Sequence, residues 1–365
     1  MNSKYLDILH LYFLFIILYC QTFKKFTNLE SFQMAGRIIK LWKSHRFQGN
    51  LNRCNSNYFE GWYYKLVDET GKYMIAFIPG VHLTTQKQDS HAFIQILNGV
   101  TNDTYYFRYH LSDINTELKH ELIKIGNSSF GLNHLQINIH DDRIHLSGEI
   151  TLSELVPWPK NFLAPNSMGW YAYMPFMECY HSVLSMHHKL SGEIVLNSKS
   201  YDFTNGNGYL EKDWGKSFPS SYVWIQTNHF EKPDMSLFVS IANIPWLGRS
   251  FRGFIIGLLF SGKVYRLTTY TGAKIKKLTV DPNFVSFTVD DGKHRLEVSG
   301  ERNSGGILSA PYESDMVNRI SESLNSKINL KFYKIRNKKT IPLYEGQGKP
   351  AAVEIHGKLE ELQSI

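Results

Sequence analysis

The stretch GYLEKDWGKSFP, from Gly208 to Pro219, runs directly into SSYVWIQTNHF, which ends at Phe230. It reads as extended chain, in which successive side chains project to opposite faces of a strand. One face would carry Tyr209, Glu211 and Asp213, and the other Leu210, Lys212 and Trp214. Glycine and proline breaks separate this strand from a second alternating one. Carboxylates among aromatic side chains at such a point are suited to a proton donor.

Earlier in the chain, YFEGWYYKLV (residues 58–67) again combines a carboxylate with aromatic residues. As a strand it would place on one face the side chains of Tyr58, Glu60, Trp62, Tyr64 and Leu66. Glu60 permits two interpretations. It is a surface carboxylate that forms a salt bridge with Lys65 or Lys212, since acidic residues are rarely fully buried. Alternatively it is buried, and desolvation would then raise its pKa and keep it protonated near neutral pH.

Most of the remaining sequence is typical of strands. Runs rich in β-branched and aromatic residues, separated by turn-forming clusters, occur at residues 74–79, 92–97, 104–109 and 143–152. The clearest hairpin is FVSFTVDDGKHRLEVSG (residues 284–300), with its turn at Asp291-Gly292. Only residues 35–43 and 313–324 favour short helices. The sequence therefore predicts a mainly β protein with few short helices.

Two segments begin alike, which indicates an internal duplication. Tyr58-Phe59-Glu60 precedes the strand MIAFIP, and Tyr209-Leu210-Glu211 precedes SLFVSIANIP. Between them, VPWPKNFLAPN (residues 156–166) contains three prolines and reads as a linker or loop. We therefore expect a first barrel-like half over residues 34–160 and a second half, with the acidic and aromatic motif, over residues 161–357. Residues 358–365 would form a C-terminal tail.

Residues 1–33 form a hydrophobic N-terminal extension, with an almost unbroken apolar run from Ile8 to Tyr19. About twelve residues are too few to span a bilayer comfortably and suit the core of a signal peptide. Tyr19 precedes Cys20, so the small residues that a cleavage site favours are missing, and an uncleaved membrane anchor is an alternative. Translation from Met34 is a third interpretation.

Charge and cysteine content argue against several classes of function. The formal net charge is +7, but the basic residues are scattered, and the densest run, KIRNKKT (residues 334–340), is typical of a turn. No nucleic-acid motif accompanies them, so we expect no nucleic-acid partner. Cys20, Cys54 and Cys179 have no short spacing, which predicts neither a disulfide framework nor a zinc site. Cys179 near His181 is interpreted as a small buried residue rather than a nucleophile.

Four motifs recur together in one known family. They are Phe59-Glu60-Gly61-Trp62-Tyr63, Pro175-Phe176-Met177-Glu178-Cys179-Tyr180-His181, Gly208-Tyr209 and Glu211-Lys212-Asp213-Trp214-Gly215. SAPYESDMVNRISES and GKPAAVEIHG add to them near the C-terminus. In these motifs the chain resembles the tocopherol cyclase family, from about Trp42 to Gly357. The resemblance implies two lipocalin-like antiparallel β-barrel halves and an enzyme that closes a prenylated hydroquinone into a chromanol ring.

Such a cyclisation sets chemical requirements for the site. A proton must reach the alkene nearest the ring, a tertiary carbocation must form in a dry pocket, and the neighbouring phenol oxygen must capture it. Asp213 or Glu211 is the leading acid, with Glu60 next. The scheme requires no redox cofactor and no metal.

The expected substrate-binding residues are mostly aromatic or carry amide and imidazole groups. They are Trp62, Tyr64, Trp170, His181, Trp214, Trp224, Gln226, Asn228 and His229. Tryptophan faces would stabilise the positive charge of the cation. His229 or Asn228 would hold the phenol.

Two other functions need similar features. A noncatalytic carrier of prenylquinones or other isoprenoid lipids needs the same apolar pocket, and a hydratase acting on a carotenoid-like alkene needs the same acid. For the cyclase, the expected partner is a hydrophobic prenylated quinol. We also expect association with a membrane or lipid-droplet surface, where such a substrate is found.

Overall fold

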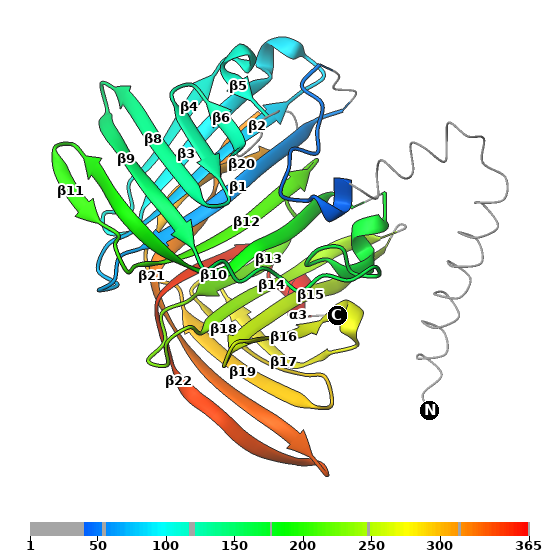
Figure 1. Cartoon of the computed structure of the whole chain (residues 1–365). Helices are drawn as coiled ribbons and strands as arrows, with labels where there is room; N and C mark the ends of the chain where they lie inside the picture. The colour runs from blue at the N-terminus through cyan, green and yellow to red at the C-terminus, as the bar shows by residue number, and fades with distance from the viewer. Residues whose placement is uncertain are drawn as a thin grey trace. The chain divides into compact units, whose positions relative to one another are not determined.

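The computed structural model describes residues 40–52, 56–116, 121–175, 177–246, 249–312 and 315–363 (Figure 1). The chain divides into two compact units, residues 1–43 and 44–365. In the smaller unit, residues 40–42 are helical. The apolar run at residues 8–19, with its expected signal or anchor role, and the alternative start at Met34 lie outside the described residues. No helix in the described ranges is long and apolar enough to cross a membrane.

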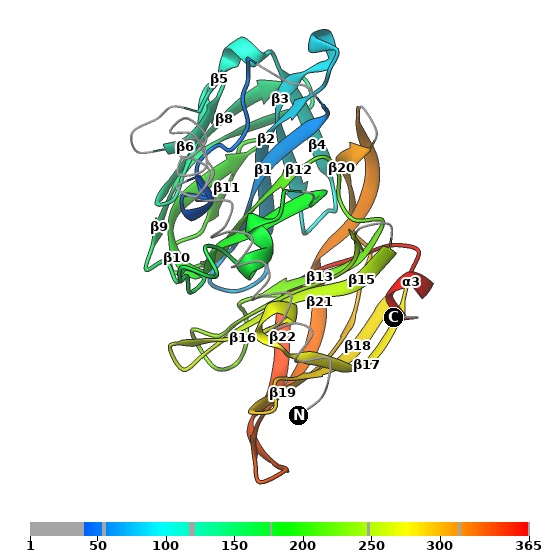
Figure 2. The same ribbon diagram turned by 90° about the vertical axis from the view of Figure 1, so that its right-hand side faces the viewer.

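The larger unit contains two antiparallel sheets, which Figures 1 and 2 show from two directions. The first sheet has twelve strands in the order β4-β3-β2-β1-β12-β10-β9-β8-β7-β6-β5, with β11 paired to β10. Its strands are β1 (Tyr58–Val67), β2 (Met74–Leu83), β3 (His91–Asn98), β4 (Thr104–Tyr109), β5 (Ile114–Asn115), β6 (Glu121–Ile125), β7 (Ser128–Gly131), β8 (His134–Asp141), β9 (Ile144–Ser153), β10 (Cys179–Leu196), β11 (Lys199–Asp202) and β12 (Asn207–Gly215).

The second sheet has ten strands in the order β16-β15-β14-β13-β22-β21-β19-β18-β17, with β20 paired to β21. Its strands are β13 (Ser221–Thr227), β14 (Ser236–Trp246), β15 (Arg249–Phe260), β16 (Lys263–Thr268), β17 (Lys274–Asp281), β18 (Phe284–Asp290), β19 (His294–Glu301), β20 (Gly306–Tyr312), β21 (Asp315–Arg336) and β22 (Lys339–Gly357). The helical elements are η1 (Lys87–Asp89), η2 (Leu111–Asp113), η3 (Gly169–Tyr173), η4 (Thr269–Thr271) and α3 (Glu360–Gln363). Within the described residues, neither strand path closes on itself.

Buried apolar side chains form three clusters, one within each sheet and one shared by both sheets. In β1, Trp62 and Tyr64 belong to the first-sheet cluster, whereas Tyr63 faces the other way and belongs to the shared cluster. Tyr209 of β12 and Trp224 of β13 also belong to the shared cluster. The face of β1 that carries Tyr63 is therefore the face that the first sheet turns toward the second.

The predicted fold class is confirmed, because the described chain is mainly β and both sheets are antiparallel. The expected hairpin is β18 and β19, and the four other predicted strands correspond to β2, β3, β4 and β9. The helix expected at residues 313–324 is wrong. Residues 315–324 begin β21, which pairs with β20 and β22. A short isolated helix is marginally stable, whereas pairing with two strands satisfies the backbone polar groups.

The expected join between two halves at residues 156–166 lies instead inside the first sheet. This segment connects β9 to β10, and the two strands pair with each other. The chain passes from the first sheet to the second between Gly215 and Ser221. The acidic motif in β12 therefore belongs to the first sheet and not to a second half that begins at residue 161, because β12 inserts between β1 and β10.

Candidate active site

Three of the motifs that are far apart in sequence lie on neighbouring strands. β12 pairs with β1 on one side and with β10 on the other. Asp213 lies opposite Gly61 of β1 and opposite His181 of β10. Two residues along β12, Glu211 lies opposite Tyr63 of β1. The strand pairing thus places an imidazole and two carboxyl groups on adjacent positions of one sheet face.

A cavity of about 170 Å³ lies between the two sheets and is bordered by this cluster. Its lining is mostly apolar and includes Phe59, Ile78, Phe93, Met168, Met177, Phe218, Ile244, Ile255, Leu308, Met316 and Ile320. Its main polar and ionisable lining residues are Tyr63, His181, Glu211, Asp213, Tyr222, Trp224, Glu322 and Glu354. An apolar cavity with a few convergent polar groups is the usual form of a small-molecule site. We call this space the inter-sheet cavity.

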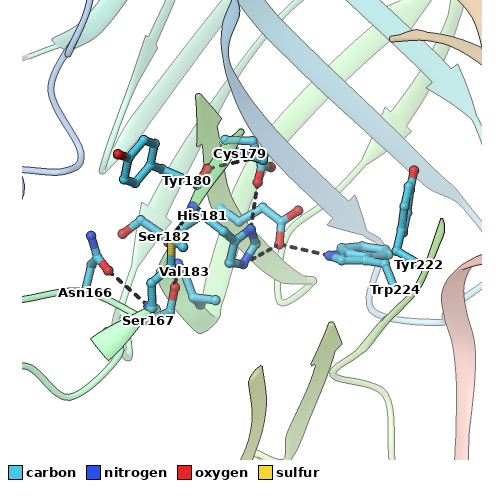
Figure 3. A network of polar contacts seen from close by, with 12 residues as sticks. Asn166, Ser167, Cys179, Tyr180, His181, Ser182, Val183, Tyr222 and Trp224 are labelled. Carbon is cyan, nitrogen blue, oxygen red and sulfur yellow. Dashed lines mark hydrogen bonds and ion pairs between the residues drawn. The ribbon is translucent and has the colours of Figure 1, made fainter. Parts of the chain in front are cut away.

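His181 lies between the carboxyl groups of Asp213 and Glu211 and contacts both. Its Nδ1 lies 2.7 Å from Asp213 Oδ1, and its Nε2 lies 3.6 Å from Glu211 Oε2. Figure 3 shows His181 at the centre of the polar network, with Trp224 on one side and Ser167 on the other. Ser167 Oγ donates a hydrogen bond to the His181 carbonyl, at 3.0 Å. The His181 backbone is therefore anchored to the segment that precedes η3.

Burial sets the protonation of this cluster. Burial raises the pKa of Glu211, the charge of His181 lowers it and that of Asp213 raises it, and the net pKa is about 8. For His181, burial lowers the pKa, but the charges of Asp213 and Glu211 outweigh it and raise the pKa to about 9. At neutral pH these directions favour a neutral Glu211 carboxyl group and a protonated His181, whose imidazole lies against Asp213.

Aromatic groups surround the Glu211 carboxyl group. Its Oε2 accepts hydrogen bonds from Tyr209 Oη at 2.6 Å and from Trp224 Nε1 at 3.1 Å. The Tyr63 ring meets the Trp224 ring edge to face, with centroids 5.3 Å apart. No group of the described residues donates a hydrogen bond to Glu211 Oε1. Oε1 is thus the oxygen that remains available to carry the proton.

Sequence reasoning missed a second pair of carboxyl groups. Glu322 of β21 and Glu354 of β22 are directly opposite each other and line the inter-sheet cavity from the second sheet. Tyr63 Oη donates a hydrogen bond to Glu322, and Tyr222 Oη donates one to Glu354 at 2.7 Å. Glu354 directly follows the apolar run Ala351-Ala352-Val353, which was the available signal. Glu322 lies among polar residues, and the helix expected at residues 313–324 gave it no strand context.

Glu60 does not line the cavity. Its carboxylate lies 2.5 Å from Lys212 Nζ, and both side chains are fully buried. It also accepts hydrogen bonds from the backbone N–H groups of Gln48 and Gly49. Lys212 Nζ donates to the Ser44 carbonyl at 2.9 Å. The expected pairing of Glu60 with Lys212 is confirmed, but the pair is buried, and it anchors residues 44–49 to β1 and β12 rather than supplying an acid.

The structure brings His181 and Trp224 to the cavity, but other aromatic residues of the expected set lie elsewhere. Trp62 and Tyr64 face the first-sheet cluster. Trp214 projects from the opposite face of β12 and stacks on Tyr180, with centroids 5.5 Å apart. Trp170 of η3 stacks on Tyr171 at 4.0 Å. Strand alternation explains the positions of Trp62, Tyr64 and Trp214. Each follows or precedes a cavity residue on its strand and therefore projects to the opposite face.

The expected phenol-binding residues also lie away from the cavity lining. Gln226 Oε1 accepts a hydrogen bond from the buried Lys65 Nζ at 2.8 Å. Asn228 Nδ2 donates to the Gly208 carbonyl at 2.8 Å, and its Oδ1 lies 3.0 Å from His229 Nδ1. Gln226 and Asn228 share the strand face of Trp224, but Lys65 and the β12 backbone occupy the space beside them.

The cluster of His181, Glu211 and Asp213 also has the composition of a metal site. The ligand atoms of His181, Glu211 and Asp213 lie within 4.8 Å of one another, and imidazole with carboxylates is a common ligand set. The same atoms already bind one another and the Tyr209 and Trp224 donors. Cys179 borders the cavity as well, but burial raises the pKa of its thiol well above the usual value, which disfavours a thiolate nucleophile.

The chain is similar to several known proteins. A family model described as tocopherol cyclase-like matches residues 133–357. The Oryza sativa subsp. japonica protein named "Probable tocopherol cyclase, chloroplastic" is 24% identical over 200 residues, which cover 53% of this chain and 42% of that protein. The Zea mays protein named "Tocopherol cyclase, chloroplastic" is 29% identical over 113 residues, which cover 29% and 23%. The chain thus spans less than half the length of these two relatives.

Among the solved structures to which the chain is similar is kievitone hydratase from Nectria haematococca. It has 13% sequence identity and a TM-score of 0.45, and the match covers 83% of this chain and 89% of that chain.

Proposed function

Because the chain belongs to the tocopherol cyclase-like family, we propose that it closes the chromanol ring of a prenylated benzoquinol. Glu211 donates a proton to the alkene nearest the ring, and the neighbouring phenol oxygen captures the resulting tertiary cation. The observation that carries the proposal is a buried carboxyl group at the wall of an apolar cavity, and this burial raises the pKa of Glu211 to about 8. A carboxylic acid that stays protonated at neutral pH is the group this reaction requires.

The neighbours of Glu211 suit both sides of the proton transfer. Before the transfer, burial keeps the carboxyl group neutral. After it, the new carboxylate retains the hydrogen bonds from Tyr209 and Trp224 and faces the His181 imidazolium at 3.6 Å. These contacts stabilise the conjugate base in a place where water cannot. Asp213 acts through His181 as a positioning residue, because its carboxylate is bonded to the imidazole.

The carbocation would form beside aromatic rings. Trp224 and Tyr63 both line the cavity and meet edge to face, and their π-faces attract positive charge. The apolar lining excludes water that would otherwise capture the cation. Trp224 therefore has two functions, as a hydrogen-bond donor to the acid and as a neighbour of the developing charge.

The cavity volume is matched to the reacting part of the substrate. A cavity of about 150 Å³ holds benzene, and the inter-sheet cavity measures about 170 Å³. A volume of this size accommodates the aromatic ring of the quinol. The prenyl tail must extend beyond the enclosed volume, along apolar lining residues such as Phe59, Phe218 and Met316.

The test is incubation of the purified protein with a reduced phytyl benzoquinol, followed by chiral chromatography and mass spectrometry. The proposal expects one enantiomer of an isomeric chromanol, and in D₂O one deuterium on carbon. A product heavier by one water would indicate a hydratase, and binding without conversion would indicate a carrier. A parallel reaction with a chelator, and one with added Zn²⁺, tests the metal alternative. Glu345→Gln, an exposed change on β22, is the matched control for Glu211→Gln.

We further propose that the protein works at a membrane or lipid-droplet surface, because a prenylated quinol partitions into lipid. The Oryza sativa and Zea mays relatives carry the description chloroplastic. Cell fractionation with the protein detected in the membrane, droplet and aqueous fractions tests this localisation. Recovery in the aqueous fraction alone contradicts it.

A further inference from the structure

The second sheet carries an unassigned pair of acids on the wall opposite Glu211. Glu322 and Glu354 are cross-strand partners on β21 and β22, and Glu354 is also the cross-strand partner of Trp224 on β13. Trp224 in turn donates its indole N–H to Glu211 of the first sheet. The inter-sheet cavity therefore has one carboxyl centre on each wall, with Trp224 between them.

The two glutamates are held in place by tyrosines from different sheets. Tyr63 of β1 donates to Glu322 Oε1, and Tyr222 of β13 donates to Glu354 Oε2. The other oxygen of Glu322 is buried and has no hydrogen-bond donor among the described residues. A proton shared with the opposite carboxyl group of Glu354 satisfies this oxygen.

The electrostatic surroundings support a shared proton. Burial and the facing Glu354 raise the pKa of Glu322 well above its usual range, and burial raises the pKa of Glu354 to about 7. Two adjacent carboxyl groups in a dry site cannot both ionise cheaply. The other titratable and charged groups that act on the pair are Tyr63 and Lys65 on β1, Asp213 on β12, Tyr222 on β13 and Arg302 after β19. Arg319 on β21 acts on Tyr222.

We propose that Glu322 and Glu354 form a proton-sharing dyad that binds the ring hydroxyl group of the substrate and accepts its proton as the ring closes. This inference rests on the proposed cyclase function. It assigns the phenol-binding role that His229 and Asn228 do not fill. It also defines the substrate class as an aromatic ring with a free hydroxyl group next to an alkenyl chain.

The atoms and charges balance in this scheme. The Glu211 O–H bond breaks as a C–H bond forms at the alkene, and the phenol O–H bond breaks as the C–O bond forms. The phenol proton goes to the ionised Glu354, so the net result is an isomer and one proton moved from Glu211 to the dyad. Exchange with solvent restores both groups, and no oxidant or reductant takes part.

A binding experiment separates this inference from the cyclase proposal. The probe is a hydroquinone with a fully saturated alkyl tail, which cannot cyclise, compared with its methyl ether at the hydroxyl group next to the tail. We expect the hydroquinone to bind about tenfold more tightly than its methyl ether, because one charge-assisted hydrogen bond contributes about this much affinity. We call this difference the hydroxyl preference. Glu322→Gln and Glu354→Gln should lose this preference, whereas Glu345→Gln and Glu211→Gln should keep it.

The outcomes distinguish the two proposals. If the wild-type protein does not convert an alkenyl quinol but shows the dyad-dependent preference, the cyclase function and the proton transfer to the dyad fail, and only the hydroxyl-binding role of the dyad stands. If the protein converts the quinol and both dyad variants keep the preference and the rate, the dyad is refuted.

A second variant addresses folding. Should either Gln variant fail to fold, Tyr222→Phe provides the test. It removes a hydrogen bond that lowers the pKa of Glu354, so this pKa should rise. The acidic limb of the pH–rate or pH–affinity profile should then move to higher pH. An unmoved limb overturns the proposal.

Discussion

His181 Nδ1 lies 2.7 Å from Asp213 Oδ1, and the same imidazole faces Glu211 through Nε2 at 3.6 Å. One histidine on β10 therefore connects two carboxyl groups of β12, of which one is an ion-pair partner and the other is a protonated acid. The distinction assigns different chemistry to Asp213 and Glu211, although the two residues are equivalent in the sequence pattern.

Replacement of Glu211 by Gln should reduce turnover at least about 100-fold, since a positioned general acid contributes 10²–10⁴. Gln keeps the size of the side chain and can still accept from Tyr209 and Trp224. The affinity for the non-cyclising saturated probe should therefore change little. Steady-state kinetics and titration of the probe measure the two quantities, and retained turnover would remove Glu211 as the acid.

Replacement of Gly61 by Leu should block the inter-sheet cavity without disrupting the fold. Gly61 lines the cavity, and a Cβ at this position meets its nearest atom, a methyl group of Ile78, only at 3.7 Å. The larger side chain then occupies the ligand volume. We expect probe binding to be lost with Gly61→Leu and only weakened with Gly61→Ala, while the melting temperature is maintained. Normal binding by the Leu variant would place the ligand elsewhere.

Replacement of Lys212 by Met should destabilise the protein by about 3–5 kcal/mol, because it leaves a buried carboxylate without its counter-charge. Glu60 and Lys212 are both fully buried and lie 2.5 Å apart. The double variant Glu60→Gln/Lys212→Met should recover part of the loss. Urea unfolding of the four proteins of this cycle measures the coupling. A Lys212→Met variant as stable as wild type would contradict the anchoring role.

The part of the free energy of unfolding that Glu211 and His181 contribute should fall as the pH rises from about 5 to 9. The folded pKa of Glu211 is raised from 4.5 to about 8, and that of His181 from 6.5 to about 9. In both cases the folded protein binds the proton more tightly than the unfolded chain does. The stabilisation is therefore complete when the pH is below the pKa of the group in the unfolded chain, and it is lost as the pH rises through the pKa in the folded protein. Glu211→Gln should remove the Glu211 part, so the stability difference between wild type and this variant should change between about pH 4.5 and 8. The difference between wild type and Glu345→Gln should stay constant over the same range, and unfolding curves at a series of pH values provide the comparison.

Local patterns predicted much of this structure. The alternation in YFEGWYYKLV correctly separates Tyr63 from Trp62 and Tyr64, which project to opposite faces of β1. The hairpin around Asp291-Gly292 was also predictable, because a tight turn and the strands beside it are set by neighbouring residues. Residues 313–324 were misjudged because the β20 and β22 partners of β21, which decide their conformation, lie outside that window.

The candidate site shows the same limit. Glu211 and Asp213 could be singled out by their aromatic surroundings, but nothing local distinguishes the acid from the ion-pair partner. That difference depends on His181, which is brought beside them by the pairing of β10 with β12. Glu60 carries an equally suggestive motif, yet its strand parity directs it to Lys212 and away from the cavity.

The sequence by itself determined the β class, the faces of the main strands and the residue types available for acid chemistry, because side-chain alternation is a property of the strand alone. Only the tertiary structure decided which face of the first sheet meets the second, and thereby placed Glu322 and Glu354 across the cavity from Glu211. Strand order and the packing of one sheet on another depend on contacts between residues far apart in the chain. For that reason the second pair of acids became visible only in the folded molecule.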